Sequence, residues 1–212
     1  MPQEVVVRAE VLKPFVQAVF EKAGFTPEGA EMQADVLVWA NLRGVDSHGV
    51  QRIAWYLDLL DKGHMKPRPS IRLEKETPAT LLIDADFAPG PVVSVPATRQ
   101  AIQKARRAGI GWAVIRNTLH QGAMGYYALM AVRENMIGIT GTNARPSIAP
   151  TFGVENMLGT NPITFGIPTD EDFPFLLDCA TSISQRGKIE VYARQGKDVP
   201  AGWVIDLDGN AR

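Results

Sequence analysis

Apolar positions in the first 63 residues recur at the spacing of amphipathic helices. The three apolar stripes are Leu12, Phe15, Val16, Val19 and Phe20; Met32, Val36, Trp39 and Ala40; and Ile53, Tyr56, Leu57 and Leu60. Positions three and four apart share one face of a helix, so we predict three helices here. We expect Pro14 in the first turn of the first helix and Gly24 at its end, with Gly63 closing the third. Thr26 should cap the second helix ahead of Pro27.

The pattern changes to an alternation of short strand-like and helical runs after residue 72. The strand-like runs are TLLIDA, GWAVI, IGITGT, ITFGI and FPFLLD, and the helical ones lie around residues 97–108, 122–134 and 184–194. Such alternation is typical of α/β proteins. We therefore expect a helical N-terminal domain (residues 1–72) followed by an α/β domain (residues 73–212), in which residues 78–180 form a sheet with helices packed on it.

Composition and charge indicate a globular protein that binds small molecules. The chain has 212 residues, 45% of them apolar, and its 22 Lys and Arg nearly balance its 23 Asp and Glu. Without a block of like charge, the sequence offers no electrostatic footprint for nucleic acid or an acidic membrane surface. The valine run in MPQEVVVRAEVLKPF is too short for a signal-peptide core, and no later window resembles a membrane span. We expect a cytoplasmic location.

The glycines do not match the phosphate-binding turn of the common dinucleotide fold. GIGWAV, residues 109–114, begins with Gly-x-Gly, but Val114 stands where the third glycine or alanine belongs. The segment also resembles the start of a strand rather than its end, and no GxxxxGK[ST] sequence is present. Any nucleotide must therefore be bound by another architecture.

The segment RGVDSHGVQR, residues 43–52, concentrates polar chemistry between the second and third predicted helices. We expect Gly44 to end one helix, Asp46 or Ser47 to cap the next, and His48 to lie in its first turn. Arg52, four residues on, would then share a face with His48. Arginine binds carboxylates and histidine transfers protons near neutral pH, so the pair suits a carboxylate beside a proton-transfer centre. The alternative is that His48 only packs at a helix end and Arg52 is solvated.

The remaining histidines and the single cysteine have simpler interpretations. His120, in RNTLHQGAMGYYALMA, ends a loop after a predicted strand, and Gly122 after it permits close backbone approach. Taken alone, this segment is also consistent with a strand-to-helix turn that holds a buried polar group. We expect His64 at the surface and Cys179 as a small buried hydrophobic residue. One cysteine excludes an intrachain disulfide and cannot form a cysteine metal site by itself, and we identify no metal site.

Together these segments resemble the malate/L-lactate dehydrogenase family that lacks the Rossmann fold. RGVDSHGVQR resembles its active-site signature, and RNTLHQGAMGYY its second histidine segment. GTNPITFGIP and LLDCATS, followed by GKIEVYARQGKDVP, resemble its cofactor-domain signatures in the same order. The family includes ureidoglycolate and sulfolactate dehydrogenases, diketogulonate reductases and cyclic imino-acid reductases such as piperideine-2-carboxylate reductase.

The resemblance implies an oxidoreductase that transfers a hydride between NAD or NADP and a small 2-hydroxy or 2-keto acid. It implies a homodimer of chains with a helical domain and a non-Rossmann α/β cofactor domain. Matched by position, His48 is the proton donor or acceptor, Ser47 and Arg52 bind substrate, and His120 lies in the same site. We favour His48 over His120 as proton carrier, because Arg52 beside it anchors the substrate carboxylate.

The resemblance also places a cofactor-contacting segment at residues 176–182. Its expected cofactor-binding residues are Asp178, Cys179, Ala180, Thr181 and Ser182, together with His120. Which 2-hydroxy acid is bound, and whether the cofactor is NAD or NADP, stays open.

Members of the family continue beyond WVIDLDGNAR for roughly another half of this length, so the chain lacks the C-terminal part that the resemblance implies. Two functions are therefore compatible with the sequence. The first is the hydride-transfer enzyme. The second is a noncatalytic remnant that acts as a dimerisation or regulatory partner. The retention of His48, Arg52 and His120 favours the enzyme.

Overall fold

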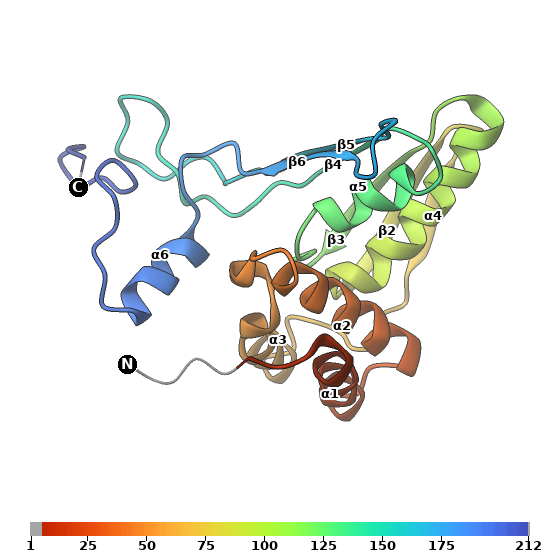
Figure 1. Cartoon of the computed structure of the whole chain (residues 1–212), viewed down its shortest axis with the longest axis horizontal. Helices are drawn as coiled ribbons and strands as arrows, with labels where there is room; N and C mark the ends of the chain where they lie inside the picture. The colour runs from red at the N-terminus through yellow and green to blue at the C-terminus, as the bar shows by residue number, and fades with distance from the viewer. Residues whose placement is uncertain (1–5, 212) are drawn as a thin grey trace.

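The computed structural model describes residues 6–211 (Figure 1), so residues 1–5 and 212 of the two expected domains lie outside the described residues. The N-terminal part is helical, as predicted. Its helices are α1 (Ala9–Lys22), α2 (Pro27–Asn41) and α3 (Ile53–Asp61). None of the helices within residues 6–211 combines the length and the apolar character needed to cross a membrane.

Local signals place the end of α1 and the start of α2 correctly, but not the start of α1. The Thr26 hydroxyl accepts a hydrogen bond from the Gly29 N–H (3.1 Å), which confirms the predicted cap of α2. Gly24 follows α1 with a φ of +97°, as expected of a helix end. The placement of Pro14 in a first turn is wrong, because α1 already begins at Ala9 and Pro14 lies inside it. Its missing N–H removes one hydrogen bond of the helix interior.

Helix α2 is the centre of the helical part and also its link to the rest of the chain. One side packs Ala34 and Leu37 into a core with Phe20 of α1. Another side packs Val36 with Tyr127, in a second cluster that joins α2 to the later helices. A helix buried on several sides is held mainly by tertiary packing rather than by its own propensity.

The first sheet contains β1 (Arg72–Glu76), β2 (Thr80–Ala88) and β3 (Trp112–Thr118), in that order. β1 pairs antiparallel with β2, and β2 pairs parallel with β3 across the connecting helix α4 (Gly90–Ala108). β1 was not predicted. All its residues are exposed and its sequence is RLEKE, so no apolar alternation marks it.

The connection from β2 to α4 has no glycine-rich phosphate-binding turn. Pro89 alone separates them, and α4 begins at Gly90, seven residues before the segment in which we expected a helix. Two prolines and three β-branched valines in residues 90–96 weaken the helical pattern there, but packing of Val93 on β2 overrides this local preference. Gly109 ends α4 with a φ of +80°, so GIGWAV does start a strand, as predicted.

The second sheet is antiparallel throughout. It contains β4 (Gly138–Gly141), β5 (Ile163–Ile167) and β6 (Phe175–Cys179) in sequence order; helix α5 (Gly125–Val132) contacts it and helix α6 (Arg186–Arg194) follows it. The expectation of one sheet over residues 78–180 is therefore wrong: within residues 6–211, the strands form two separate three-stranded sheets. Apolar alternation identifies strands but not their partners. The α/β fold class is confirmed.

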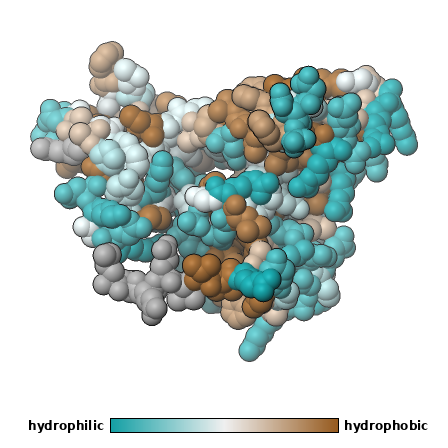
Figure 2. All heavy atoms as spheres, viewed as in Figure 1, coloured by the Kyte–Doolittle hydropathy of each residue, from teal (hydrophilic) through white to brown (hydrophobic). Residues whose placement is uncertain are grey.

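One face of the second sheet is apolar and uncovered. Its exposed side chains include Ile139, Ile163 and Leu177, and Figure 2 shows hydrophobic residues gathered over β4–β6. Cys179 is paired with Ile163 and is exposed, so the expectation of a buried cysteine is wrong. Strand alternation placed Cys179 on the face away from α5.

Candidate active site

The segment of residues 43–52 folds into two tight turns rather than the start of an α-helix. The turns are 3-10 helices separated by Gly49: Asp46–His48 and Val50–Arg52. Asn41, at the end of α2, organises them. Its amide nitrogen donates to Asp46 Oδ1 (2.5 Å), and its amide oxygen accepts from the Val50 N–H (2.8 Å). A side chain at Gly49 would collide with Asn41, so glycine is required there.

The predicted helix start in this segment is wrong. α3 begins only at Ile53, and its N-cap residue, Arg52, forms no side-chain cap. The Asp46 carboxylate accepts a hydrogen bond from Asn41 instead of capping a helix. Gly49 has an extended backbone (φ −89°, ψ −156°), so His48 and Arg52 do not share a face of one helix. Arg52 instead folds back, and its Nε donates to the Ser47 carbonyl oxygen (2.6 Å). Gly44, at a φ of +69°, follows the end of α2, as expected of a helix end.

The structure brings together His48 and His120, which are 72 positions apart in the sequence. Their rings are stacked, with centroids 5.2 Å apart and planes inclined by 27°. His120 lies between β3 and α5, and its backbone carbonyl packs directly on Gly90, where any side chain would collide with it. Close packing of the loop on the first turn of α4 therefore holds His120 beside the His48 turn.

His120 is held through its Nδ1 atom. The Tyr56 hydroxyl lies 2.7 Å from this nitrogen, and the Gly122 N–H points at it from 3.2 Å. The Trp55 ring stands edge-on to the imidazole, with centroids 5.5 Å apart. Backbone and side-chain contacts together determine the orientation of the ring.

His48 is held through its Nδ1 atom as well. This nitrogen lies 3.0 Å from the Ser47 hydroxyl, which accepts a hydrogen bond from the side-chain amide of Gln185 (2.9 Å). Gln185 immediately precedes α6, so a segment 138 residues away completes the support of His48.

The Nε2 atoms of both rings remain available to a ligand. Among residues 6–211, no group hydrogen-bonds to either Nε2, and neither atom is among the buried side-chain atoms that lack a partner. Both atoms are therefore accessible. Two imidazoles with their Nδ1 atoms fixed and their Nε2 atoms open form a pair of proton-handling groups.

Both histidines are neutral at physiological pH. Burial and the nearby Arg52 charge lower the pKa of His48 to about 4, although Asp178 opposes the shift. Burial, the His48 ring and Arg52 lower the pKa of His120 to about 3. The main cause of the lowered pKa of both rings is therefore desolvation.

Arg52 is mostly buried beside the histidines and faces α6. Its Nη1 lies 3.6 Å from a carboxylate oxygen of Glu190, and a side chain at Gly187 would collide with the guanidinium. The long Glu190 contact leaves the guanidinium with N–H groups for a second anion, since arginine has five donors. Arg52 therefore keeps donors suited to a small carboxylate next to the imidazoles.

The segment of residues 178–182 lies at the end of β6, and its side chains point in different directions. Asp178 accepts hydrogen bonds from the Gly125 N–H and the Thr164 hydroxyl, both at 2.7 Å. The first bond attaches β6 to the first residue of α5, and the second attaches it to β5. Cys179 alternates to the opposite face of the strand, so the two side chains do not face one common ligand. The Thr181 hydroxyl donates to backbone carbonyls of the β4–β5 loop.

Two buried polar atoms near the histidines lack partners. The Ser184 hydroxyl, adjacent to Gln185, and the Gln121 side-chain oxygen, adjacent to His120, form no hydrogen bond. Unpaired buried polar groups are costly unless a ligand satisfies them. A hydroxyl can donate and an amide oxygen can accept a hydrogen bond, and a carboxamide such as that of nicotinamide needs one contact of each kind.

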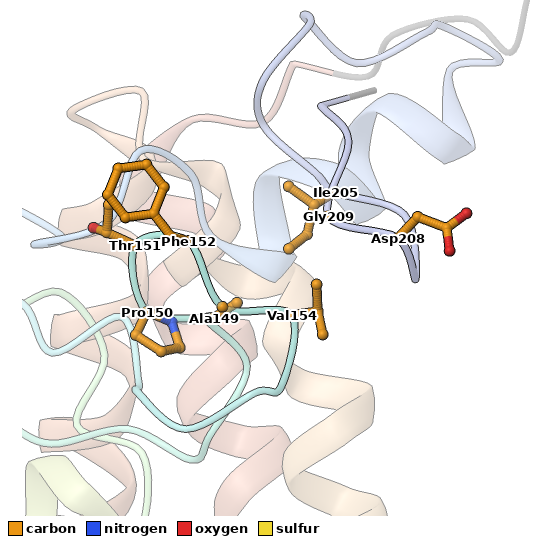
Figure 3. Close-up of a pocket in the computed structure, with 9 residues that line it drawn as sticks. Ala149, Pro150, Thr151, Phe152, Val154, Ile205, Asp208 and Gly209 are labelled. Atoms are coloured by element: carbon orange, nitrogen blue, oxygen red, sulfur yellow. The ribbon is translucent and has the colours of Figure 1, made fainter.

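A separate cavity of about 490 Å³ lies between residues 149–154 and the turn at residues 205–209 (Figure 3). None of its lining residues contacts either histidine, and we assign it no part in the site. His64 is exposed in the loop after α3, as predicted.

Four supporting residues were not found from the sequence: Asn41, Tyr56, Gln185 and Glu190. Tyr56 was identified only as part of an apolar stripe. The one available signal was its hydroxyl, because a tyrosine on a buried helix face needs a hydrogen-bond partner. The other three gave no signal, since their partners are determined by tertiary packing.

Comparison with known proteins identifies the family that this chain resembles. The family described as malate/L-lactate dehydrogenase matches residues 7–212. A malate dehydrogenase from Pyrococcus horikoshii is 51% identical over 196 residues, which are 92% of this chain and 54% of that protein. An L-sulfolactate dehydrogenase from Methanocaldococcus jannaschii is 41% identical over 204 residues, which are 96% of this chain and 59% of that protein.

A solved structure is similar over nearly the whole chain. The crystal structure of malate dehydrogenase from Entamoeba histolytica superposes with a TM-score of 0.96 at 43% identity, covering 99% of this chain and 58% of that one. The chain thus spans little more than half the length of the relatives it matches.

Proposed function

Because this chain belongs to the malate/L-lactate dehydrogenase family, we propose that it acts in NAD(P)-dependent hydride transfer to and from a small 2-hydroxy or 2-keto acid. The observation that carries the proposal is the pair of neutral imidazoles, His48 and His120, with open Nε2 atoms beside the Arg52 guanidinium. In a 2-hydroxy acid, the carboxylate is attached to the carbon that bears the hydroxyl group. During oxidation this carbon loses a hydride and its hydroxyl oxygen loses a proton. The site offers a partner for the carboxylate and for the proton.

Arg52 would bind the substrate carboxylate by charge-assisted hydrogen bonds. The Ser47 carbonyl already fixes its Nε, so the guanidinium is oriented before substrate arrives. Such positioning accelerates a reaction by holding the reacting carbon in one place. Ser47 contributes by supporting both Arg52 and His48.

His48 would accept the hydroxyl proton on Nε2 during oxidation and return it to the carbonyl oxygen during reduction. A neutral imidazole is required for the oxidation step, and the lowered pKa of His48 provides it. A bound substrate carboxylate would raise that pKa again by its negative charge, which prepares His48 to hold the proton. His120 would contact the same oxygen.

Dehydrogenases of this family use nicotinamide cofactors. Bound nicotinamide supplies the hydride acceptor in oxidation and the hydride donor in reduction. The proposed cofactor-binding residues are His120 and residues 178–182, together with the unpaired groups of Ser184 and Gln121. Since both carboxylate oxygens of Asp178 are bonded within the protein, it would act by fixing the start of α5. Cys179 would contribute through its backbone, and Ala180, Thr181 and Ser182 would approach the dinucleotide.

We also retain the proposed domain division at residues 72 and 73, the homodimer and the cytoplasmic location. This domain division would put the substrate-binding groups of residues 47–52 on the helical domain and His120 on the α/β domain. Hydride transfer would then occur where the two domains meet. Sedimentation of the purified protein tests the homodimer.

The noncatalytic alternative is not favoured. A dimerisation or regulatory partner has no chemical need for two desolvated histidines and an arginine in one place, because burying such groups costs stability.

Steady-state kinetics with several 2-hydroxy acids and either NAD or NADP tests the proposal. We expect reduced nicotinamide to form with at least one acid, and the exchange of exposed His64 for Gln to leave the rate unchanged. His48→Ala should abolish most of the NAD(P)-dependent turnover. Turnover that survives in a variant lacking both His48 and His120 would contradict the proposal.

A further inference from the structure

Tyr56 is the one tyrosine whose hydroxyl reaches the histidine pair. Its side chain is fully buried on α3, between Phe20 and Trp55, with ring centroids 6.3 Å and 5.3 Å away. A hydroxyl in such apolar surroundings is stable only with a hydrogen-bond partner. That partner is the Nδ1 atom of His120, at 2.7 Å.

A second contact determines the direction of this hydrogen bond. The Gly122 N–H points at the same Nδ1 from 3.2 Å, and a backbone N–H can only donate. Nδ1 must therefore be the nitrogen without a proton, and the Tyr56 hydroxyl must donate to it as well. Burial raises the pKa of Tyr56 well above its usual range, so the hydroxyl keeps its proton.

Gly122 is suited to this contact because of its backbone conformation. Its φ is +75°, and a Cβ atom there would lie 2.6 Å from a methyl group of Val36. Only glycine can turn its N–H toward His120 at this point without strain. The fold thus supplies two donors to one ring nitrogen, one from the backbone and one from Tyr56.

We propose that Tyr56 is a positioning residue that fixes His120 as the imidazole tautomer with its proton on Nε2. The inference rests on the proposed function, and it divides the chemistry between the two histidines. His120 presents an N–H at the substrate side, so it donates a hydrogen bond to the reacting oxygen and cannot accept the substrate proton.

His48 differs because, within residues 6–211, its Nδ1 contacts the Ser47 hydroxyl and no backbone N–H donates to it. The Ser47 oxygen accepts from Gln185 and has a second lone pair, so it can accept from His48 Nδ1–H too. His48 Nε2 is then the unprotonated nitrogen and receives the proton. Two cationic rings 5.2 Å apart, beside Arg52, would repel strongly, so assigning one ring as a neutral donor lets the other become charged.

Nitrogen NMR of the histidine rings tests the tautomer directly. The chain contains only three histidines, and His64→Gln and His48→Gln variants assign their resonances. We expect His120 to carry its proton on Nε2 at neutral pH. In Tyr56→Phe, the Nδ1 resonance should move toward that of a nitrogen with no hydrogen bond. A wild-type His120 with its proton on Nδ1 would overturn the proposal even if the variant does not fold.

Tyr127→Phe is the matched control. Tyr127 is equally buried, but its hydroxyl donates to the Gln121 backbone carbonyl (2.5 Å) rather than to an imidazole. The control variant should keep the wild-type His120 tautomer and Nδ1 resonance. An unchanged Nδ1 resonance in Tyr56→Phe, or an equal change in both variants, contradicts a specific role for Tyr56.

Kinetics separates positioning from a purely structural role. Loss of one hydrogen bond to His120 should lower kcat about tenfold with little change in KM. The acidic limb of the pH profile should move to higher pH, because Nδ1 is more basic when the Gly122 N–H is its one remaining donor. A profile that keeps its shape would overturn the proposal. A wild-type protein with the expected tautomer but no NAD(P)-dependent turnover would refute the proposed function and leave the positioning of His120 standing.

Discussion

The lowered pKa values of His48 and His120 make stability depend on pH in a range where carboxylates contribute little. In the unfolded chain both histidines titrate near 6.5, whereas in the folded protein their pKa values are about 4 and about 3. Below pH 6.5, the two histidines of the unfolded chain take up protons that those of the folded protein do not. The stability is therefore fully present above pH 6.5, falls as pH drops from there, and stops falling below the folded pKa values.

The magnitude follows from the size of the shifts. Each pH unit below 6.5 costs roughly 1.4 kcal/mol per histidine, so lowering the pH from about 7.5 to about 5.5 should reduce the free energy of unfolding by roughly 2 to 3 kcal/mol. Aspartate and glutamate, with ordinary pKa values of about 4, stay ionised in both states over this interval. The histidine contribution is thereby isolated from acid denaturation.

Urea unfolding followed by tryptophan fluorescence at the two pH values measures this difference. His48→Gln and His120→Gln should each retain about half of it, because one shifted group remains in each. Tyr127→Phe should lower the free energy of unfolding equally at both pH values, since its buried hydroxyl keeps its proton throughout. Equal wild-type stability at both pH values would refute the assignment of desolvated, neutral histidines, as would an undiminished pH dependence in both glutamine variants.

Three further predictions concern catalysis. His48→Ala should reduce turnover roughly a hundredfold or more, the scale of general acid–base catalysis, with less effect on binding; near-normal turnover would transfer the proton-carrying role to His120. Arg52→Ala should weaken apparent substrate affinity by on the order of 2 to 3 kcal/mol, with nicotinamide fluorescence showing little change in cofactor binding. Lysine there should rescue only partly, because a point charge does not reproduce the planar fork. Glu190→Gln should lower KM about two- to fivefold, since it removes a carboxylate that competes for Arg52; an unchanged or raised KM would show that Glu190 orients the arginine instead.

Sequence reasoning located the candidate site chiefly through segments that resemble a family. His48 and Arg52 lie in one ten-residue segment and His120 in another, so their residue types and order could be recognised before any fold was known. The predicted placement of His48 and Arg52 on one helical face was wrong, because no continuous helix runs across Gly49. Asn41 holds that segment in two turns instead, and nothing in the spacing of residues 43–52 indicates this.

The sequence by itself determined the elements whose signals are local: three amphipathic helices, the Thr26 cap, most strands and the absence of a glycine-rich phosphate turn. These depend on residues within a few positions of each other. Only the tertiary structure decided that the strands form two sheets and that the charged segment Arg72–Glu76 is a strand. It also decided the contacts of Tyr56 with His120 and of Gln185 with Ser47, which join residues 64 and 138 positions apart. Such partners are selected by the packing of whole elements, which a local pattern of apolar and polar positions does not encode.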